Sequence, residues 1–329
     1  MKKMLLMLGV AAAAMTSCTN DEVVEVNPAS VIKFESFVNK GTRAVTDTDE
    51  DITKFYVFGY HETTTTPVND FINEEVSKGN EKWDYDGDVY WTVAQYYFGA
   101  YATKNASDQL TANTQVSFAN RTLTFTNYTV NDDNDLVAAL VEKPVGSITT
   151  DPGVVGFNFQ HLLSKIQFTF VNNVTNHKMY ISNVNIAKYP ATGTCTYSST
   201  GAEWDLVEDS ENKPLSTTAE NAGIVKDGTY SDNFLVIPTP AATTISDEYT
   251  VTFKATFKNA SGEIVSEKVY PATKLNADVL QWKPGYVYNY KATLVLDQKR
   301  IEFGAPTVTP WNSNLDDNNG TNDDITLLQ

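Results

Sequence analysis

The sequence predicts a mainly β protein built from two β-sandwich domains in tandem. Its composition includes 17 Tyr and 16 Phe, and Thr and Val are abundant, which is typical of half-buried strands rather than helices. Several segments alternate apolar and polar residues with the two-residue period of a strand. With 329 residues, the chain is long enough for two domains of roughly 130 to 150 residues, each with its own core.

The first 18 residues have the organisation of an export signal. Lys2 and Lys3 are followed by an apolar stretch, residues 4–14, and by small residues that end at Cys18. The apolar stretch is too short to span a bilayer, and no other stretch reaches the roughly 18 to 20 apolar residues of a membrane helix. The end of the signal resembles a bacterial lipobox, in which signal peptidase II cuts between Ser17 and Cys18 and the Cys18 thiol receives diacylglycerol.

Charge and cysteine content limit the partners and the covalent structure. The formal net charge of −17 argues against a nucleic-acid partner and against simple adsorption to anionic lipid. If Cys18 carries lipid, Cys195 is the only remaining thiol, so no intramolecular disulfide is expected. Cys195 is predicted to be a partly buried residue of a strand or turn.

Residues 31–44 predict a short edge strand that a protease could remove. Ile32 and Phe34 point to one side and their neighbours to the other, until Phe37 and Val38 break the alternation. Glycine and threonine then precede Arg43, which places the bond between Arg43 and Ala44 in a flexible, exposed segment that a trypsin-like protease would cut. The alternative is that any arginine in a polar linker has this appearance.

The first half, residues 44–160, is expected to form one sandwich. Its predicted strands are a central strand buried on both faces at 55–60, an aromatic strand region at 89–103, a strand at 121–130 and a further strand at 136–141. The strand at 121–130 is expected to have one wet face, with Leu123, Phe125 and Asn127 together on the other side. Residues 63–78 are polar and are expected to be a surface excursion. The aromatic cluster at 89–103 could stack on sugars, but core packing is the favoured interpretation.

The second half, residues 161–329, is expected to form the other sandwich. The alternation changes phase between residues 160 and 165, which indicates a bend where the chain passes between the domains. The expected elements are a polar excursion at 191–231 and strands at 179–189, 249–257, 263–270, 286–296 and 301–303. The acidic tail ends in an apolar segment, residues 325–328, which could either fray or pair with another strand.

No catalytic, metal or cofactor site is predicted. The three histidines lack a metal-ligand spacing, and His161 is expected to be a partly buried, hydrogen-bonding residue at the bend. The Asp-rich turns at 84–88 and 316–320 lack a carboxylate at the first position of a calcium loop. Carboxylate pairs are too common in so acidic a chain to indicate a glycosidase. The chain is therefore not expected to be an enzyme.

Taken in order along the chain, five features resemble the fimbrillins, the lipoprotein subunits of type V pili in Gram-negative gut and oral bacteria. These features are the lipobox at Cys18 and the segments 32–44, 90–101, 159–170 and 282–290. The resemblance implies two transthyretin-like β-sandwiches and delivery to the outer membrane as a lipoprotein, followed by a place in a cell-surface fimbrium that serves adhesion. It also implies an Arg-specific or trypsin-like protease that removes the first strand.

On this chain, the resemblance implies a signal peptide at 1–17, a tether with the removable strand at 18–43, and cleavage between Arg43 and Ala44. A strand from another pilin subunit would then fill the vacated groove. The residues concerned are Val31, Ile32, Phe34, Phe37 and Val38 in the removable strand, and Ile325, Leu327 and Leu328 in the candidate donor. The candidate donor is short for the family, so a tip or accessory subunit fits nearly as well as a stalk subunit. The alternative is a non-polymerising surface lipoprotein that binds glycans through exposed aromatic rings, and the receptor is unknown in either case.

Overall fold

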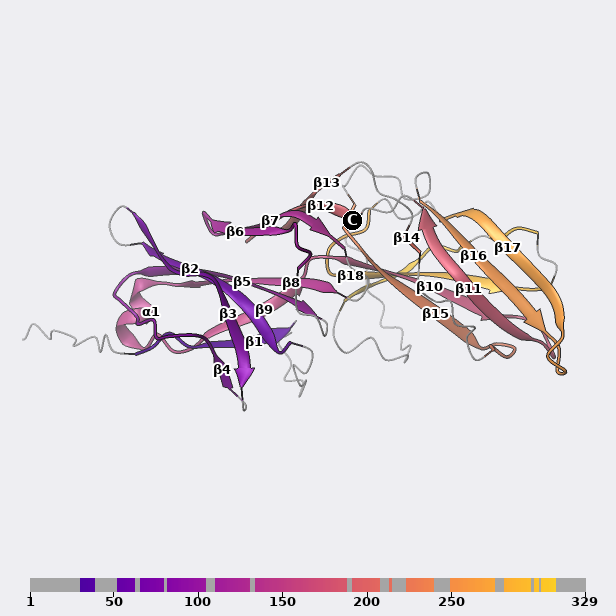
Figure 1. Cartoon of the computed structure of the whole chain (residues 1–329), viewed down its shortest axis with the longest axis horizontal. Coiled ribbons are helices and arrows are strands. Elements are labelled where there is room, and N and C mark those ends of the chain that lie inside the picture. The colour runs from indigo at the N-terminus through magenta and orange to yellow at the C-terminus, as the bar shows by residue number, and fades with distance from the viewer. Residues whose placement is uncertain are drawn as a thin grey trace, which may run out of the picture.

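The chain folds into β-sheets that form two groups along the long axis of the molecule (Figure 1). The computed structural model describes residues 30–38, 52–62, 66–79, 82–104, 110–130, 134–187, 191–207, 213–214, 223–239, 249–275, 281–296, 299–301 and 303–311. Within these residues the secondary structure is almost entirely strand, with one short helix, α1 (Val145–Thr150). The predicted mainly β fold with two sandwiches is confirmed. No helix among the described residues is both long enough and apolar enough to cross a membrane.

The first group is built on a seven-stranded sheet with the order β1-β9-β8-β5-β2-β3-β4. Its strands are β1 (Phe34–Val38), β2 (Lys54–Glu62), β3 (Pro67–Gly79), β4 (Lys82–Asp84), β5 (Gln95–Lys104), β8 (Asp135–Lys143) and β9 (Val155–His161). A four-stranded sheet covers one face, and it consists of β6 (Gln115–Ala119), β7 (Thr122–Thr129), β12 (Thr192–Ser198) and β13 (Gly201–Leu206). The seven-stranded sheet therefore carries a buried apolar cluster on each face.

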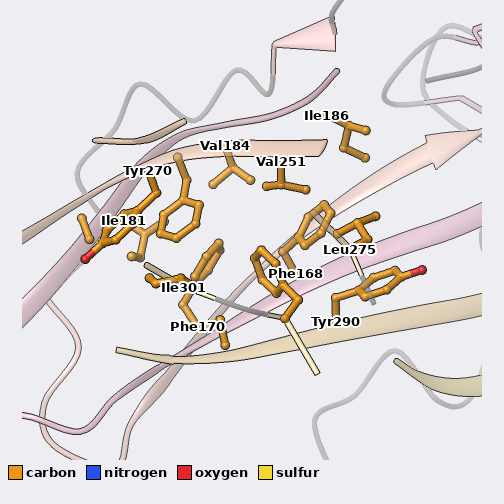
Figure 2. Packing of buried hydrophobic residues seen from close by; sticks show 14 of the residues in the cluster. Phe168, Phe170, Ile181, Val184, Ile186, Val251, Tyr270, Leu275, Tyr290 and Ile301 are labelled. Carbon is orange, nitrogen blue, oxygen red and sulfur yellow. The ribbon is translucent and has the colours of Figure 1, made fainter. Parts of the chain in front are cut away.

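The second group is a sandwich of two four-stranded sheets. One sheet holds β15 (Thr229–Val236), β10 (Ser164–Asn172), β18 (Tyr286–Leu294) and β19 (Thr307–Pro310), and the other holds β14 (Lys213–Pro214), β11 (Lys178–Ala187), β16 (Thr250–Lys258) and β17 (Ile264–Lys274). Side chains from both sheets meet in one core, where Phe168 and Phe170 of β10 face Val251 of β16 and Tyr270 of β17 (Figure 2). The alternation predicted for 249–257 and 286–296 is confirmed by the burial of the apolar residues of 249–257 and of Tyr288 to Leu294, whereas Tyr286 at the start of β18 is exposed.

Three local predictions require correction. Residues 67–79 form β3 rather than a surface excursion, because Phe71 and Val76 are buried while the rest of the strand faces mainly solvent. In β7, Asn127 has φ 57, so the chain bulges and Tyr128, not Asn127, joins the buried side. Ile301 and Phe303 are buried in the second core but are not part of a strand.

The predicted division at residue 160 assigns the hairpin β12–β13 to the second sandwich, but the hairpin lies in the first. It follows that division in the chain, yet β12 pairs antiparallel with β7 of the first sandwich. Cys195 of β12 is fully buried against Phe125 of β7 rather than partly buried. The phase change at 160–165 is the gap between β9 and β10, where the chain leaves one sheet for another. The hairpin then returns to the first sandwich, where β12 pairs with the edge of β7 and adds Cys195 to the buried cluster between the sheets.

Candidate functional site

Strand β1 lies at the edge of the seven-stranded sheet, parallel to β9 (Figure 1). The register pairs Phe34 with Val155 and Val38 with Phe159. The Val155 N–H donates to the Lys33 carbonyl at 2.8 Å, which extends the pairing before the strand begins. The sequence predicted an edge strand here, and the structure places it in the first sandwich.

The residues just before β1 also bond on their other side. The Ile32 N–H donates to the Val89 carbonyl at 2.8 Å, and the Trp91 N–H donates to the Ser30 carbonyl at 3.1 Å. The Tyr85 hydroxyl donates to the Ile32 carbonyl at 2.9 Å. Because successive peptide groups of an extended chain point to opposite sides, this segment lies between β9 and residues 85–91. No pattern in the sequence indicated this second contact.

The inward side chains of this segment are Ile32, Phe34 and Ser36, and Lys33 and Glu35 are exposed. This is the predicted alternation. Ile32 is 0% and Phe34 is 4% exposed. The structure describes only the backbone of Phe37 and Val38, so their side chains lie outside the described part of the chain.

Phe34 is enclosed by aromatic rings contributed by several other strands. Its ring centroid lies 5.1 Å from that of Phe71, 5.5 Å from Tyr85 and 5.8 Å from Phe157. Phe98 and Phe55 complete the enclosure at 6.0 and 6.5 Å. Edge-to-face and offset pairs at these distances are favourable beyond the burial of area alone. The aromatic residues of β5 are therefore core, as the favoured interpretation held, and Phe98 forms part of the pocket around Phe34.

The other predicted site residues lie outside the described residues. They are Ser17 and Cys18 at the lipobox, Arg43 and Ala44 at the cleavage site, and Ile325, Leu327 and Leu328 in the candidate donor. Within the described residues, no three His, Cys, Asp or Glu side chains gather in a way that could hold a metal ion.

A second polar feature lies where the two sandwiches meet. His161 is buried at the end of β9, and its Nδ1 is 2.5 Å from Oδ2 of Asp135 on β8. Trp311 stacks on the His161 ring with a centroid distance of 4.2 Å, and the Trp311 N–H donates to the Gly285 carbonyl at 2.7 Å. The sequence predicted a hydrogen-bonding role for His161, but it did not identify Asp135 or Trp311 as its neighbours. These contacts hold the start of the second sandwich and the end of β19 against the first.

Comparisons with known proteins agree with this architecture. A fimbrial protein from Bacteroides vulgatus ATCC 8482 has a similar fold, with a TM-score of 0.65 at 15% identity over 86% of this chain and 99% of that chain. A candidate cell adhesion protein from Bacteroides uniformis ATCC 8492 is similar with a TM-score of 0.50 at 21% identity, again over 86% of this chain and 99% of that chain. At these identities the likeness shows the fold alone. None of the curated proteins matches the sequence. The fimbrillin-like family matches residues 42–311, so the chain belongs to the fimbrillin-like family.

Proposed function

We propose that this chain is a structural subunit of a type V fimbria that serves cell adhesion and is assembled by removal of its first strand and donor-strand exchange. Family membership supports the fimbrial role. The observation that supports the assembly step is the position of β1, a five-residue edge strand whose first side chain, Phe34, occupies a pocket made by rings of other strands. Other fimbrial subunits are the partners that this role requires.

The free energy that β1 contributes favours its replacement by another strand over its removal without replacement. Burying Ile32 and Phe34 contributes about 1.5 to 3 kcal/mol each, and each backbone bond to β9 contributes about 1 kcal/mol. If residues up to Arg43 left the sandwich, the rings around Phe34 and the outer edge of β9 would be exposed to water. Such an edge is a template for a strand with apolar residues at alternate positions. Ile325 and Leu327 have that spacing.

The position of the subunit in the filament depends on whether the chain donates a strand to a neighbour as well as accepting one. A stalk subunit needs both a groove and a donor strand, whereas a tip or accessory subunit needs only the groove. The candidate donor at 325–328 is shorter than β1 together with the bonded residues before it. Lipid on Cys18 would hold the subunit at the outer membrane until an Arg-specific or trypsin-like protease cuts after Arg43.

The alternative, a non-polymerising lipoprotein with an exposed aromatic platform for glycans, receives less support. Trp91, Trp282 and Trp311 are all buried. Tyr90 and Tyr286 are the tyrosines among the described residues with large exposed fractions, 48% and 37%. They lie in different sandwiches, so they do not make a flat stacking surface together.

The proposal is tested with protein that begins at Thr19 and is treated briefly with an Arg-specific protease under native conditions. The expected result is one cut after Arg43, followed by oligomers or filaments that resist detergent if the chain also donates. A matched Arg43→Ala variant should stay intact and monomeric, which separates this cut from cuts at Arg121 or Arg300. A clean cut that leaves only monomers would identify a tip or accessory subunit. Resistance of the Arg43 bond, with cutting at the other arginines, would overturn the removable-strand proposal.

A further inference from the structure

A cleft of about 820 Å³ lies on the first sandwich at its junction with the second. Its volume falls in the range of roughly 300 to 1,000 Å³ that is usual for sites that bind small ligands. Asn158 and Gln160 of β9 line it, and they alternate along the strand with Phe157 and Phe159, which face the pocket of Phe34. The cleft is therefore on the opposite face of the sheet from the β1 site.

One wall of the cleft carries a charged pair on an aromatic ring. Nη2 of Arg121 donates to the Tyr97 hydroxyl at 2.6 Å, and the guanidinium lies 4.2 Å from the centroid of the Tyr97 ring. Nη1 of Arg121 lies 3.7 Å from a carboxylate oxygen of Glu142. Both charged side chains remain about half exposed, at 54% and 55%. The pair therefore offers a ligand both hydrogen-bond donors and an acceptor, and its own two charges cancel.

The backbone at Arg121 is strained, and the strained turn sets the direction of the Arg121 side chain. Asn120 and Arg121 form the two-residue turn between β6 and β7, with φ 50 and 63. A turn of this kind favours glycine at its second residue, and an ordinary side chain there costs about 1 to 2 kcal/mol. Strain of this size is often found at functional sites. Here the turn directs the Arg121 side chain onto Tyr97 at the cleft wall.

The remaining lining combines side-chain amides, hydroxyls and a tyrosine ring. Asn158 and Gln160 are exposed on β9, and Ser198 and Ser199 come from the turn of the β12–β13 hairpin. Tyr286 lines the cleft from the second sandwich and is 37% exposed. Amides both donate and accept hydrogen bonds, and a tyrosine ring packs against apolar C–H groups.

This set of groups selects among ligand classes. Arg121 is the one lysine or arginine among the described residues that line the cleft, and Glu142 already faces it. A chain with a net charge of −17 also repels anionic ligands. A purely apolar ligand would cover the exposed Gln160 amide and the half-exposed charged pair without replacing their contacts with water. We propose that the cleft binds a neutral saccharide, with hydroxyls bonded to Arg121, Glu142 and the β9 amides and one sugar face packed on Tyr286.

The test uses protein that begins at Thr19 and carries Arg43→Ala, so that β1 stays in place and the result is independent of the proposed strand exchange. The probes are maltohexaose, cellohexaose, xylohexaose, mannohexaose and lacto-N-neotetraose, with sialyllactose as the anionic comparison. Binding is measured by saturation-transfer NMR and by calorimetry. The expected result is saturable binding of at least one neutral oligosaccharide, with a dissociation constant in the millimolar range or tighter.

Two variants identify the cleft as the site. Arg121→Gly removes the guanidinium and gives the turn the residue it favours, so it should remain folded while binding weakens by about tenfold or more. Gln160→Ala, at an exposed strand position, should weaken binding to a similar extent. Asn233→Ala removes an exposed strand amide in the second sandwich and should leave binding unchanged. Failure of all the neutral probes, binding of sialyllactose alone, or binding that survives both cleft variants would overturn the proposal.

Discussion

Phe34 is the residue on which the attachment of the first strand most depends. The Phe34→Ala variant of the uncleaved chain should lower the free energy of unfolding by about 3 to 5 kcal/mol, because it leaves a cavity among rings that belong to five other strands or loops. Urea unfolding followed by tryptophan fluorescence measures the change. Glu35→Ala, one position away on the exposed side, should stay within about 0.5 kcal/mol of the parent. Equal stability of the two variants would show that Phe34 does not anchor the strand.

At the residue scale, local rules predicted the direction of most side chains, but they did not predict which distant residues pair. The inward direction of Ile32 and Phe34 follows from a two-residue period that any short stretch displays. Asn127 was predicted on the buried side, but a single left-handed residue inverts the phase beyond it. The partner of His161 is 26 residues away in the chain, and no spacing rule links a buried histidine to one aspartate among many in an acidic sequence.

At the element scale, the sequence indicated where strands lie better than which strands pair. Segment 67–79 has only two buried apolar anchors, Phe71 and Val76, so its polar composition concealed a strand with one wet face. The hairpin β12–β13 is similarly polar on its outer side, and its pairing with β7 joins residues about 70 positions apart. For the same reason, the edge position of β1 could be predicted from its length and kink, while its parallel pairing with β9 could not.

Because the β12–β13 hairpin is docked on β7, the reactivity of Cys195 reports whether the hairpin is closed or open. In protein that begins at Thr19, Cys195 is the only thiol, and it is fully buried opposite Phe125. Burial also raises the pKa of the Cys195 thiol, so little reactive thiolate forms while the hairpin stays docked. Iodoacetamide should label Cys195 only when the hairpin opens, and Phe125→Ala should speed labelling by about a hundredfold or more because it removes the packing beneath it. Mass spectrometry of timed samples measures the rate. Labelling of the native protein as fast as in urea would contradict the pairing of β12 with β7.

At the scale of the whole molecule, the two sandwiches share part of their core. Leu235 and Ile237 at the end of β15 and Trp311 after β19 belong to the same buried cluster as Phe125. Trp204 of the hairpin donates its indole N–H to the Leu162 carbonyl at 2.9 Å, between β9 and β10. Composition and length correctly indicated material for two cores. They could not indicate that the cores touch, because the contact is made by segments from both sides of the predicted division at residue 160.

Buried and partly buried tyrosines make the stability of the whole molecule depend on pH in the alkaline range. Burial raises the pKa of Tyr197 and Tyr288 to about 12, from an ordinary value of 10.0, and it also raises the pKa of Tyr101, Tyr128 and Tyr290. Between pH 10 and about 12 the folded state therefore binds more protons than the unfolded state, so stability is full below pH 10 and falls as pH rises through this window. We expect tyrosinate absorbance from these rings to appear together with the loss of the β-sheet circular dichroism signal.

The Tyr197→Phe variant gives the sharper measurement of this linkage. It removes one of the ionisable groups whose pKa is raised by burial and keeps the aromatic ring. The alkaline midpoint of unfolding should therefore move to higher pH relative to the parent, while urea stability near neutral pH changes much less. An exposed-site control, Tyr90→Phe, should leave the midpoint in place. If the parent ionised all of its tyrosines gradually around pH 10 with its sheet signal intact, the rings would have to be accessible to solvent, and the packed junction of the two sandwiches would be the first feature to question.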